Sequence, residues 1–308
     1  MATESIPVSL VLGSGGARGL AHIGVIQWLV DNGHDIRSIA GSSMGALVGG
    51  IYAARKLEVY VEWVLALERM HVLRLLDPAI GRPGIFKGER IISVLRSLIG
   101  DCAIEDLPIA FTAVATDLES GAEVWLRKGN LFDAIRASMA TPLVFTPFEL
   151  DGRTLLDGAI VNPVPIGPTV GDATALTIAV NLSGPPQVDA LAAPSPSLID
   201  DNSYRRRILK FIESVRPGNG AKEPSRGMIS TAMASMQTMQ DTITRLRMAE
   251  YSPDVVIEVP RNACGFFDFW KAEALIALGR ERAASAFASF EAARSGERGL
   301  AEQGPDRT

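Results

Sequence analysis

A serine between glycines stands where a strand-like segment gives way to one rich in alanine and leucine. Ser43 is the central residue of Gly41-Ser42-Ser43-Met44-Gly45, which fits the pattern G-x-S-x-G. Residues 36–40 before it predict a short strand, and residues 46–54 after it predict a buried helix. A serine at such a turn is typical of the nucleophile of an ester hydrolase. The pattern is short, so a chance match in a glycine-rich chain stays open as an alternative.

A glycine-rich segment follows the first predicted strand, residues 8–12. It reads Gly13-Ser14-Gly15-Gly16-Ala17-Arg18-Gly19. Arg18 stands where the dinucleotide-binding pattern G-x-G-x-x-G requires its third glycine, and the segment lacks the Gly-Lys-Ser/Thr of a Walker loop. Successive backbone amides at the start of a helix can instead bind one negatively charged oxygen. The segment therefore indicates an oxyanion hole, with a purely structural glycine turn as the alternative.

A serine nucleophile needs a base, and histidine is its usual partner. In α/β-hydrolases the histidine follows the acid near the C-terminus. The three histidines of this chain, His22, His34 and His71, all precede the candidate acid described next. The chain therefore cannot have the α/β-hydrolase order of serine, acid and histidine, and we expect all three histidines to be structural.

A carboxylate is the alternative base. Asp157 follows Thr154-Leu155-Leu156 at the end of a short predicted strand, and Gly158 permits a tight turn beside it. A carboxylate is intrinsically a weak base for a hydroxyl. Within hydrogen-bond reach it can still accept the proton as the carbon–oxygen bond forms. Asp-Gly is also a common turn pair, so a turn without a catalytic role stays open here.

The segments around these residues alternate between strand and helix, which is typical of a layered α/β domain. Strands are predicted at 8–12, 36–40, 109–116, 123–126, 154–157, 175–182 and 255–259. Helices are predicted at 20–32, 46–54, 57–70, 89–99 and 131–139, and residues 76–88 predict a loop.

Composition narrows the class of protein. The chain has 308 residues, of which 47% are hydrophobic and 21% charged, enough apolar residues for a substantial core. Its net charge of −5 argues against nucleic-acid binding, which needs a basic surface. We find neither a basic segment followed by an apolar run at the start nor about 18 uninterrupted apolar residues. The two cysteines, Cys102 and Cys264, are widely spaced, and we expect both to be reduced and buried. Together these observations predict a soluble, cytoplasmic protein.

Four motifs in a fixed order resemble the patatin-like phospholipase family. They are Gly15-Gly16-Ala17-Arg18-Gly19, Gly41-Ser42-Ser43-Met44-Gly45, Ala137-Ser138-Met139-Ala140-Thr141-Pro142 and Asp157-Gly158-Ala159. The resemblance extends from Val8 to about Pro168, and residues 253–257 look like the closing strand of the family. Bacterial single-domain members, similar to the catalytic part of neuropathy target esterase, are closest in pattern. Ser14 and Ala159 depart from it, since many members have glycine there.

The resemblance implies a three-layer α/β/α patatin-like fold with a mostly parallel central sheet. It implies a catalytic dyad of Ser43 and Asp157, and an oxyanion hole of backbone amides at Gly15, Gly16, Ala17 and Arg18. The implied reaction is hydrolysis of acyl esters in lipids or lysophospholipids, with no cofactor and no metal.

Domain boundaries and lipid contact follow as further expectations. We expect a catalytic domain at residues 6–262, with a mobile insertion or lid at 185–227, and a C-terminal helical extension at 263–308 packed on the domain or trailing from it. Residues 204–215 combine four basic residues with apolar ones. They could lie on an anionic membrane as a peripheral contact at the inner face, or pack as a helix with a solvated basic side.

Two rival functions remain at this point. One is a non-catalytic module that binds a nucleotide or anion through the glycine-rich segment. The other is a regulatory adaptor that keeps the fold but acts by binding a partner.

Overall fold

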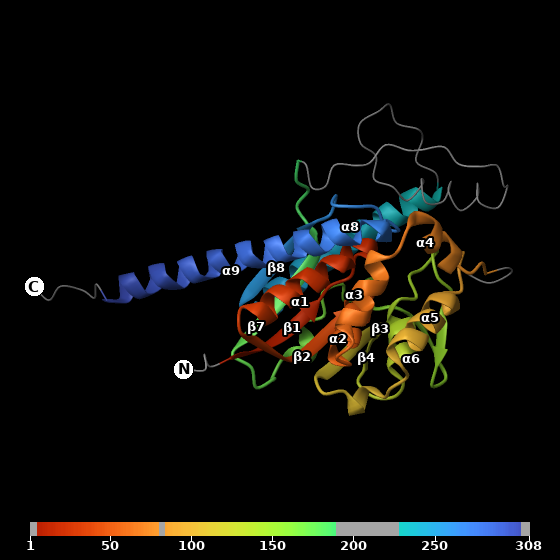
Figure 1. The fold of residues 1–308 in the computed structure, drawn as a ribbon, viewed down its shortest axis with the longest axis horizontal. Coiled ribbons are helices and arrows are strands. Elements are labelled where there is room, and N and C mark those ends of the chain that lie inside the picture. Colours follow the sequence, from red (N-terminus) through yellow and green to blue (C-terminus); the bar gives the residue numbers. More distant parts are fainter. Residues whose placement is uncertain (1–4, 80–83, 189–227, 303–308) are drawn as a thin grey trace, which may run out of the picture.

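The computed structural model describes residues 5–79, 84–188 and 228–302 (Figure 1). Residues 189–227 of the predicted insertion, including the basic segment 204–215, lie outside the described residues. Among the helices that are described, none is both long and apolar enough to cross a lipid bilayer.

One sheet of eight strands forms the centre of the described chain, in the order β5-β6-β3-β2-β1-β7-β8 with β4 also paired to β3. The strands are β1 (Ile6–Leu12), β2 (His34–Ser42), β3 (Ala110–Asp117), β4 (Glu123–Leu126), β5 (Phe148–Leu150), β6 (Arg153–Asp157), β7 (Leu176–Gly184) and β8 (Val255–Pro260). The pairings β3-β2-β1-β7-β8 are parallel, whereas β4, β5 and β6 join antiparallel at one side. The prediction of a mostly parallel sheet is confirmed.

Helices cover both faces of the sheet. They are α1 (Ala21–Asp31), α2 (Met44–Ala53), α3 (Leu57–Leu65), α4 (Arg69–Leu75), α5 (Glu89–Ile99), α6 (Leu131–Ser138), α8 (Met228–Tyr251) and α9 (Ala272–Glu302). Short 3-10 turns are η1 (Gly16–Leu20), η2 (Ile104–Asp106), η3 (Gly158–Ile160), η4 (Gly167–Thr169) and η5 (Phe269–Lys271).

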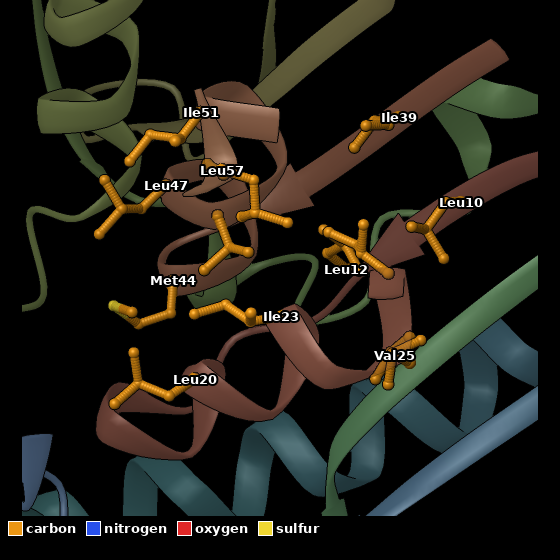
Figure 2. Packing of buried hydrophobic residues seen from close by; sticks show 14 of the residues in the cluster. Leu10, Leu12, Leu20, Ile23, Val25, Ile39, Met44, Leu47, Ile51 and Leu57 are labelled. Carbon is orange, nitrogen blue, oxygen red and sulfur yellow. The ribbon is translucent and has the colours of Figure 1, made fainter. Parts of the chain in front are cut away.

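The alternation of side chains along β1 separates the two helical layers. Leu10 and Leu12 belong to the main core, which includes residues of α1, α2 and α9 (Figure 2). Val11, on the other side of the pleat, packs in a smaller cluster that includes Met248 and Tyr251 of α8. The architecture is therefore the predicted three-layer α/β/α arrangement.

The long C-terminal helix lies along α1 and runs past the body of the domain (Figure 1). A Cβ atom at Gly24 would overlap the carbonyl of Ile276, and one at Gly279 would overlap the carbonyl of Ala21. The two backbones can approach this closely only because glycine stands at both crossing points. Residues 291–295 of α9 are exposed. The division of the chain at residue 262 stays a prediction.

The predicted helix at 57–70 is wrong, because the chain forms two helices there. Helix α3 ends at Leu65, and Glu68 takes an extended backbone conformation. The Glu68 side chain then caps α4 while the His71 side chain accepts a hydrogen bond from the Glu68 amide. This reciprocal cap starts a new helix where the apolar spacing alone suggests continuity.

The other predicted elements are found within a few residues of their expected bounds. Helix α5 and strand β4 have the predicted ends, and β2 is longer than the predicted strand by two residues on each side. Both cysteines are free, and Cys264 is buried as expected whereas Cys102 is partly exposed.

Candidate active site

Ser43 occupies a sharp turn between β2 and α2. Its backbone has φ 55° and ψ −120°, a conformation that L-residues rarely adopt. Glycine on either side makes the turn possible, because a Cβ at Gly41 would overlap Gly45 and a Cβ at Gly45 would overlap the Leu12 carbonyl. The predicted strand–serine–helix elbow is therefore present, and the first turn of α2 directs its positive dipole end toward Ser43.

A second serine holds the turn in place. The Ser43 amide donates to Oγ of Ser138 at 2.9 Å, and the Ser138 hydroxyl donates to the carbonyl of Val114 at 2.6 Å. Ser138 is the last residue of α6, and Val114 lies in β3. The elbow is thus fixed to a neighbouring strand and helix by a side chain whose role the sequence does not reveal.

Asp157 lies at the end of β6, within hydrogen-bond distance of Ser43. The Ser43 hydroxyl donates to Oδ2 of Asp157 at 2.8 Å. Strand β3 brings the two together, since it pairs Val114 with Ser42 on one side and Ala115 with Asp157 on the other.

Two further donors hold the carboxylate. The Thr141 hydroxyl donates to Oδ2 at 2.6 Å, and the Ala159 amide donates to Oδ1 at 2.9 Å. Asp157 is only 3% exposed. Burial raises the pKa of its carboxyl above the ordinary value, and the hydrogen bonds from Thr141, Ala159 and Ser43 oppose that rise. A buried carboxylate with a raised pKa is a stronger base than a solvated one.

The glycine-rich segment lies in the same region, and its amides are not equivalent. The Gly13 amide donates to Val180, the Ser14 amide to Pro163 and the Ala17 amide to Phe266, all through backbone carbonyls at 2.9–3.0 Å. The amides of Gly15 and Gly16 have no hydrogen-bond partner among the described residues. Of the predicted donors, the structure therefore leaves Gly15 and Gly16 available and shows Ala17 engaged elsewhere.

The Arg18 side chain is engaged outside the dyad. Its Nη1 donates to the carbonyl of Arg261 at 2.8 Å. Burial lowers the pKa of this guanidinium. The side chain ties the turn η1 to the chain after β8, so only its backbone could serve the expected oxyanion hole.

None of the three histidines forms a hydrogen bond with Ser43 or Asp157, which agrees with the prediction that they are structural. His22 bonds through Nε2 to the carbonyl of Gly13 at 2.8 Å, and burial lowers its pKa to about 4. The ring is therefore neutral with its proton on Nε2. His34 bonds to the carbonyl of Leu29, and His71 caps α4.

An apolar pocket opens beside Ser43. The empty space between its walls measures about 690 Å³, a volume that includes the part open to solvent. The lining residues come from the glycine-rich turn, from the elbow and α2, from α3, α4 and α5 and the chain between them, from the turn after α6 and from the aromatic segment before α9, residues 266–270: Gly16, Ser43, Met44, Leu47, Tyr60, Trp63, Leu67, Val72, Leu75, Leu76, Ile91, Leu95, Met139, Thr141, Phe145, Phe266, Phe267 and Phe269. Three residues of the aromatic segment before α9, Phe266, Phe267 and Phe269, thus form one wall of the pocket. Its residue Phe267 is also a buried core residue.

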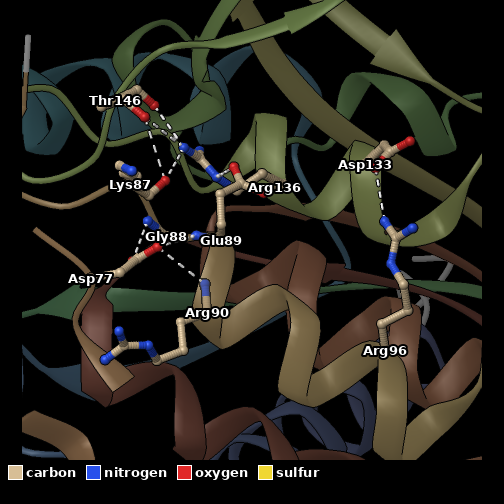
Figure 3. Close-up of polar contacts among 9 residues, drawn as sticks. All are labelled: Asp77, Lys87, Gly88, Glu89, Arg90, Arg96, Asp133, Arg136 and Thr146. Atoms are coloured by element: carbon tan, nitrogen blue, oxygen red, sulfur yellow. Dashed lines mark hydrogen bonds and ion pairs between the residues drawn. The ribbon is translucent and has the colours of Figure 1, made fainter. Parts of the chain in front are cut away.

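A buried arginine braces the wall of this pocket (Figure 3). Arg136 of α6 donates to the carbonyls of Lys87 and Thr146 and to the Thr146 hydroxyl, and pairs with Glu89 at 3.3 Å. Burial lowers its pKa, and Glu89 opposes the shift. The network joins the start of α5 to the turn that carries Thr141 and Phe145. Nearby, Asp77 accepts hydrogen bonds from the first amides of α5.

The structure places the two predicted residues Ser43 and Asp157 side by side, and their catalytic roles stay a prediction. It adds Ser138 and Thr141 beside them, two residues of the motif at 137–142 to which the sequence assigns no role. The signal in the sequence is the pair of hydroxyl residues at the end of α6 and in the turn after it. Among the described residues, no group of three or more His, Cys, Asp or Glu side chains is arranged to hold a metal ion.

Comparison with known proteins gives one match over the motif region and another over nearly the whole chain. A family model described as patatin-like phospholipase matches residues 10–170. An uncharacterised NTE family protein of Mycobacterium tuberculosis strain H37Rv is 40% identical over 336 aligned residues, which cover 94% of this chain and 93% of its own.

Two further matches are more distant. Neuropathy target esterase sws of Drosophila melanogaster is 32% identical over 165 residues, which are 51% of this chain and 12% of its own. The crystal structure of VipD from Legionella pneumophila aligns with 92% of this chain and 68% of its own at 12% identity and a TM-score of 0.43, a similarity too weak to argue from.

Proposed function

Because this chain belongs to the patatin-like phospholipase family, a family of lipid ester hydrolases, we propose that it is a serine acyl hydrolase acting on lysophospholipids, phospholipids or simpler carboxylic esters. The observation that carries the proposal is the 2.8 Å hydrogen bond from the Ser43 hydroxyl to Oδ2 of Asp157 beside an apolar pocket.

In the first half of the reaction, Oγ of Ser43 attacks the acyl carbonyl carbon. The serine proton passes to Oδ2 of Asp157 as the new carbon–oxygen bond forms. Negative charge develops on the carbonyl oxygen, and the free amides of Gly15 and Gly16 are the donors proposed to bind it. The intermediate then expels the alcohol, which takes the proton back from Asp157, and leaves the acyl group on Ser43.

In the second half, water takes the place of the alcohol. Asp157, again a carboxylate, accepts a proton from the water as it attacks the acyl-enzyme. The same amides bind the oxyanion, and collapse of the intermediate returns the proton to Oγ of Ser43 and releases a carboxylic acid. A carboxylate has no tautomers to select, so this base does not need the residue that fixes the tautomer of a histidine.

The pocket supports an acyl chain as the group bound next to Ser43. Its described lining is dominated by aliphatic and aromatic side chains from α3, α4, α5 and the aromatic segment. Burying a methylene group contributes about 0.8 kcal/mol, so a chain of several carbons would bind appreciably there. A cytoplasmic location and membrane contact by residues 204–215 stay predictions from the sequence.

A fluorophosphonate probe tests the proposed nucleophile. We expect covalent labelling of the folded parent protein and none of Ser43→Ala. Asp157→Asn should hydrolyse p-nitrophenyl butyrate about 10³-fold more slowly or worse, because the base is lost. Its thermal unfolding temperature should not fall, since a neutral amide replaces a buried charge.

The outcomes separate the proposal from its rivals. Absence of labelling in a folded parent would leave an anion-binding module or an adaptor. Labelling that persists in Ser43→Ala would place the nucleophile elsewhere. A hydrolysis screen over lysophospholipids, diacyl phospholipids and triglycerides then identifies the substrate class.

A further inference from the structure

We propose that Thr141 is a positioning residue of this site, whose hydroxyl holds the Asp157 carboxylate opposite Ser43 and keeps it ready to accept a proton. The inference rests on the proposed dyad and adds to it the orienting group that a two-residue site otherwise lacks. No sequence motif assigns this role, which follows from the position of one hydroxyl.

The geometry fixes the carboxylate at both oxygens. Thr141 Oγ1 lies 2.6 Å from Oδ2 of Asp157, closer than the Ser43 hydroxyl at 2.8 Å. The Ala159 amide holds Oδ1 at 2.9 Å. With a donor on each oxygen besides Ser43, the carboxylate cannot rotate about its Cβ–Cγ bond without losing a charge-assisted hydrogen bond.

Thr141 is itself rigidly held. Its carbonyl accepts hydrogen bonds from the amides of Val144 and Phe145 at 3.1 and 2.8 Å. The Asp157 amide donates to the carbonyl of Ala140 at 3.1 Å, which ties the end of β6 to the same turn. A β-branched side chain has few rotamers. The hydroxyl is therefore presented to Oδ2 by a fixed backbone and a stiff side chain.

The surroundings of Asp157 make this one hydroxyl important. Burial raises the pKa of the Asp157 carboxyl. Hydrogen bonds from Thr141, Ala159 and Ser43 oppose that rise, and no charged side chain of the described residues contributes. Thr116 approaches from β3, but its hydroxyl donates to the backbone carbonyl of Asp157 at 2.9 Å, not to the carboxylate.

The two hydroxyls on Oδ2 have different fates in the proposed reaction. Ser43 gives up its proton in the first step and is esterified in the acyl-enzyme, so it no longer donates. Thr141 is then the one described side chain that still donates to Oδ2 when water must be activated. Its loss should impair the site at the stage where Asp157 depends on it most.

The test compares Thr141→Val, which removes the hydroxyl at nearly constant shape, with Thr141→Ser, which keeps it. The readout is the pH dependence of kcat/KM and kcat for p-nitrophenyl butyrate. Loss of a donor to the charged carboxylate raises its pKa, so the acid limb of Thr141→Val should move up by about one to two pH units. Its kcat should fall about 10- to 100-fold, and kcat/KM, which reports the acylation step, should fall less.

The controls distinguish the loss of the Thr141 hydroxyl, which donates to the carboxylate, from the loss of another buried hydroxyl nearby. Thr116→Val also removes a buried hydroxyl next to Asp157 and should leave the acid limb where it is. Thr141→Ser should keep the limb within about half a unit of the parent, because a serine hydroxyl can reach Oδ2. Thermal unfolding of each variant confirms that it is folded.

Two results would overturn the inference. One is an unmoved acid limb and undiminished kcat in folded Thr141→Val; the other is a Thr141→Ser variant impaired as much as Thr141→Val. If Thr141→Val fails to fold, the serine variant and Thr141→Ala decide by the same readout. If either result is obtained while the fluorophosphonate probe still labels the parent at Ser43, only the role of Thr141 is rejected. If the probe does not label the parent, the proposed function is rejected, and this inference with it.

Discussion

The Ala17 amide donates a 2.9 Å hydrogen bond to the carbonyl of Phe266, which joins the glycine-rich turn to the aromatic wall of the pocket. Arg18, the next residue, bonds to Arg261 in the chain that leads to the same wall. Segments almost 250 positions apart thus form one unit around Ser43. Changes in either segment should affect both the proposed oxyanion amides and the pocket.

Gly16→Ala should damage both parts of this unit. Gly16 has φ +56°, and a Cβ there would lie 2.7 Å from Cδ2 of Phe266 and 2.8 Å from its carbonyl oxygen. We expect the free energy of unfolding to fall by about 1–3 kcal/mol and kcat for p-nitrophenyl butyrate to fall about 100-fold.

Gly33→Ala is the matched control for that variant. Gly33 also has a positive φ, +79°, but nothing lies within 4 Å of an added Cβ. It should lose about 1 kcal/mol of stability through backbone strain and keep its kcat. A Gly16→Ala protein with full activity would contradict the assignment of the loop.

Leu67→Trp should shorten the pocket. Leu67 lines it between α3 and α4. The larger side chain should lower kcat/KM for p-nitrophenyl dodecanoate about tenfold or more, because several methylene groups lose their contacts, and leave the acetate ester nearly unaffected. Leu65→Trp, at an exposed position two residues earlier, should leave kcat/KM unchanged for both the dodecanoate and the acetate ester. Equal effects on short and long esters would argue against an acyl chain in this pocket.

His22 should make the fold sensitive to acid. Burial lowers its pKa from 6.5 to about 4, so between these values the unfolded chain binds a proton that the folded protein does not. The free energy of unfolding should therefore fall as the pH falls from 6.5 to 4, by about 3 kcal/mol in total.

His22→Gln should remove most of that dependence. A glutamine amide can still donate to the Gly13 carbonyl but takes up no proton. Urea unfolding of both proteins at several pH values measures the difference, in which contributions of other groups such as Asp157 cancel. The same slope in both proteins would show that His22 is not responsible.

Arg136→Met should destabilise the pocket wall. The Arg136 side chain is 3% exposed and donates to the backbone of Lys87 and Thr146, so its removal leaves buried acceptors unpaired (Figure 3). We expect a loss of about 2–4 kcal/mol in the free energy of unfolding, measured in urea.

Arg96→Met provides the comparison. Its ion pair with Asp133 is formed by side chains that are 35% and 38% exposed, and such pairs contribute at most about 1 kcal/mol. Similar losses in the two variants would mean that the buried network adds nothing beyond a surface pair.

Local sequence determined much of this protein. Strands, most helices and the elbow at Ser43 follow from apolar spacing and from glycines at one sharp turn, which are properties of neighbouring residues. Because no histidine follows Asp157, the sequence indicates the carboxylate itself as the base. The helix predicted at 57–70 was wrong because the cap formed by Glu68 and His71 outweighs an apolar pattern that continues through it.

Only the tertiary structure decided how the site is completed. The register of β3 against β2 and β6 places Asp157 beside Ser43, and the turn after α6 adds Thr141. The contact of Ala17 with Phe266 selects which amides stay free. These features depend on hydrogen bonds between residues that are distant in the chain, and spacing along a sequence carries no information on which distant donor meets which acceptor.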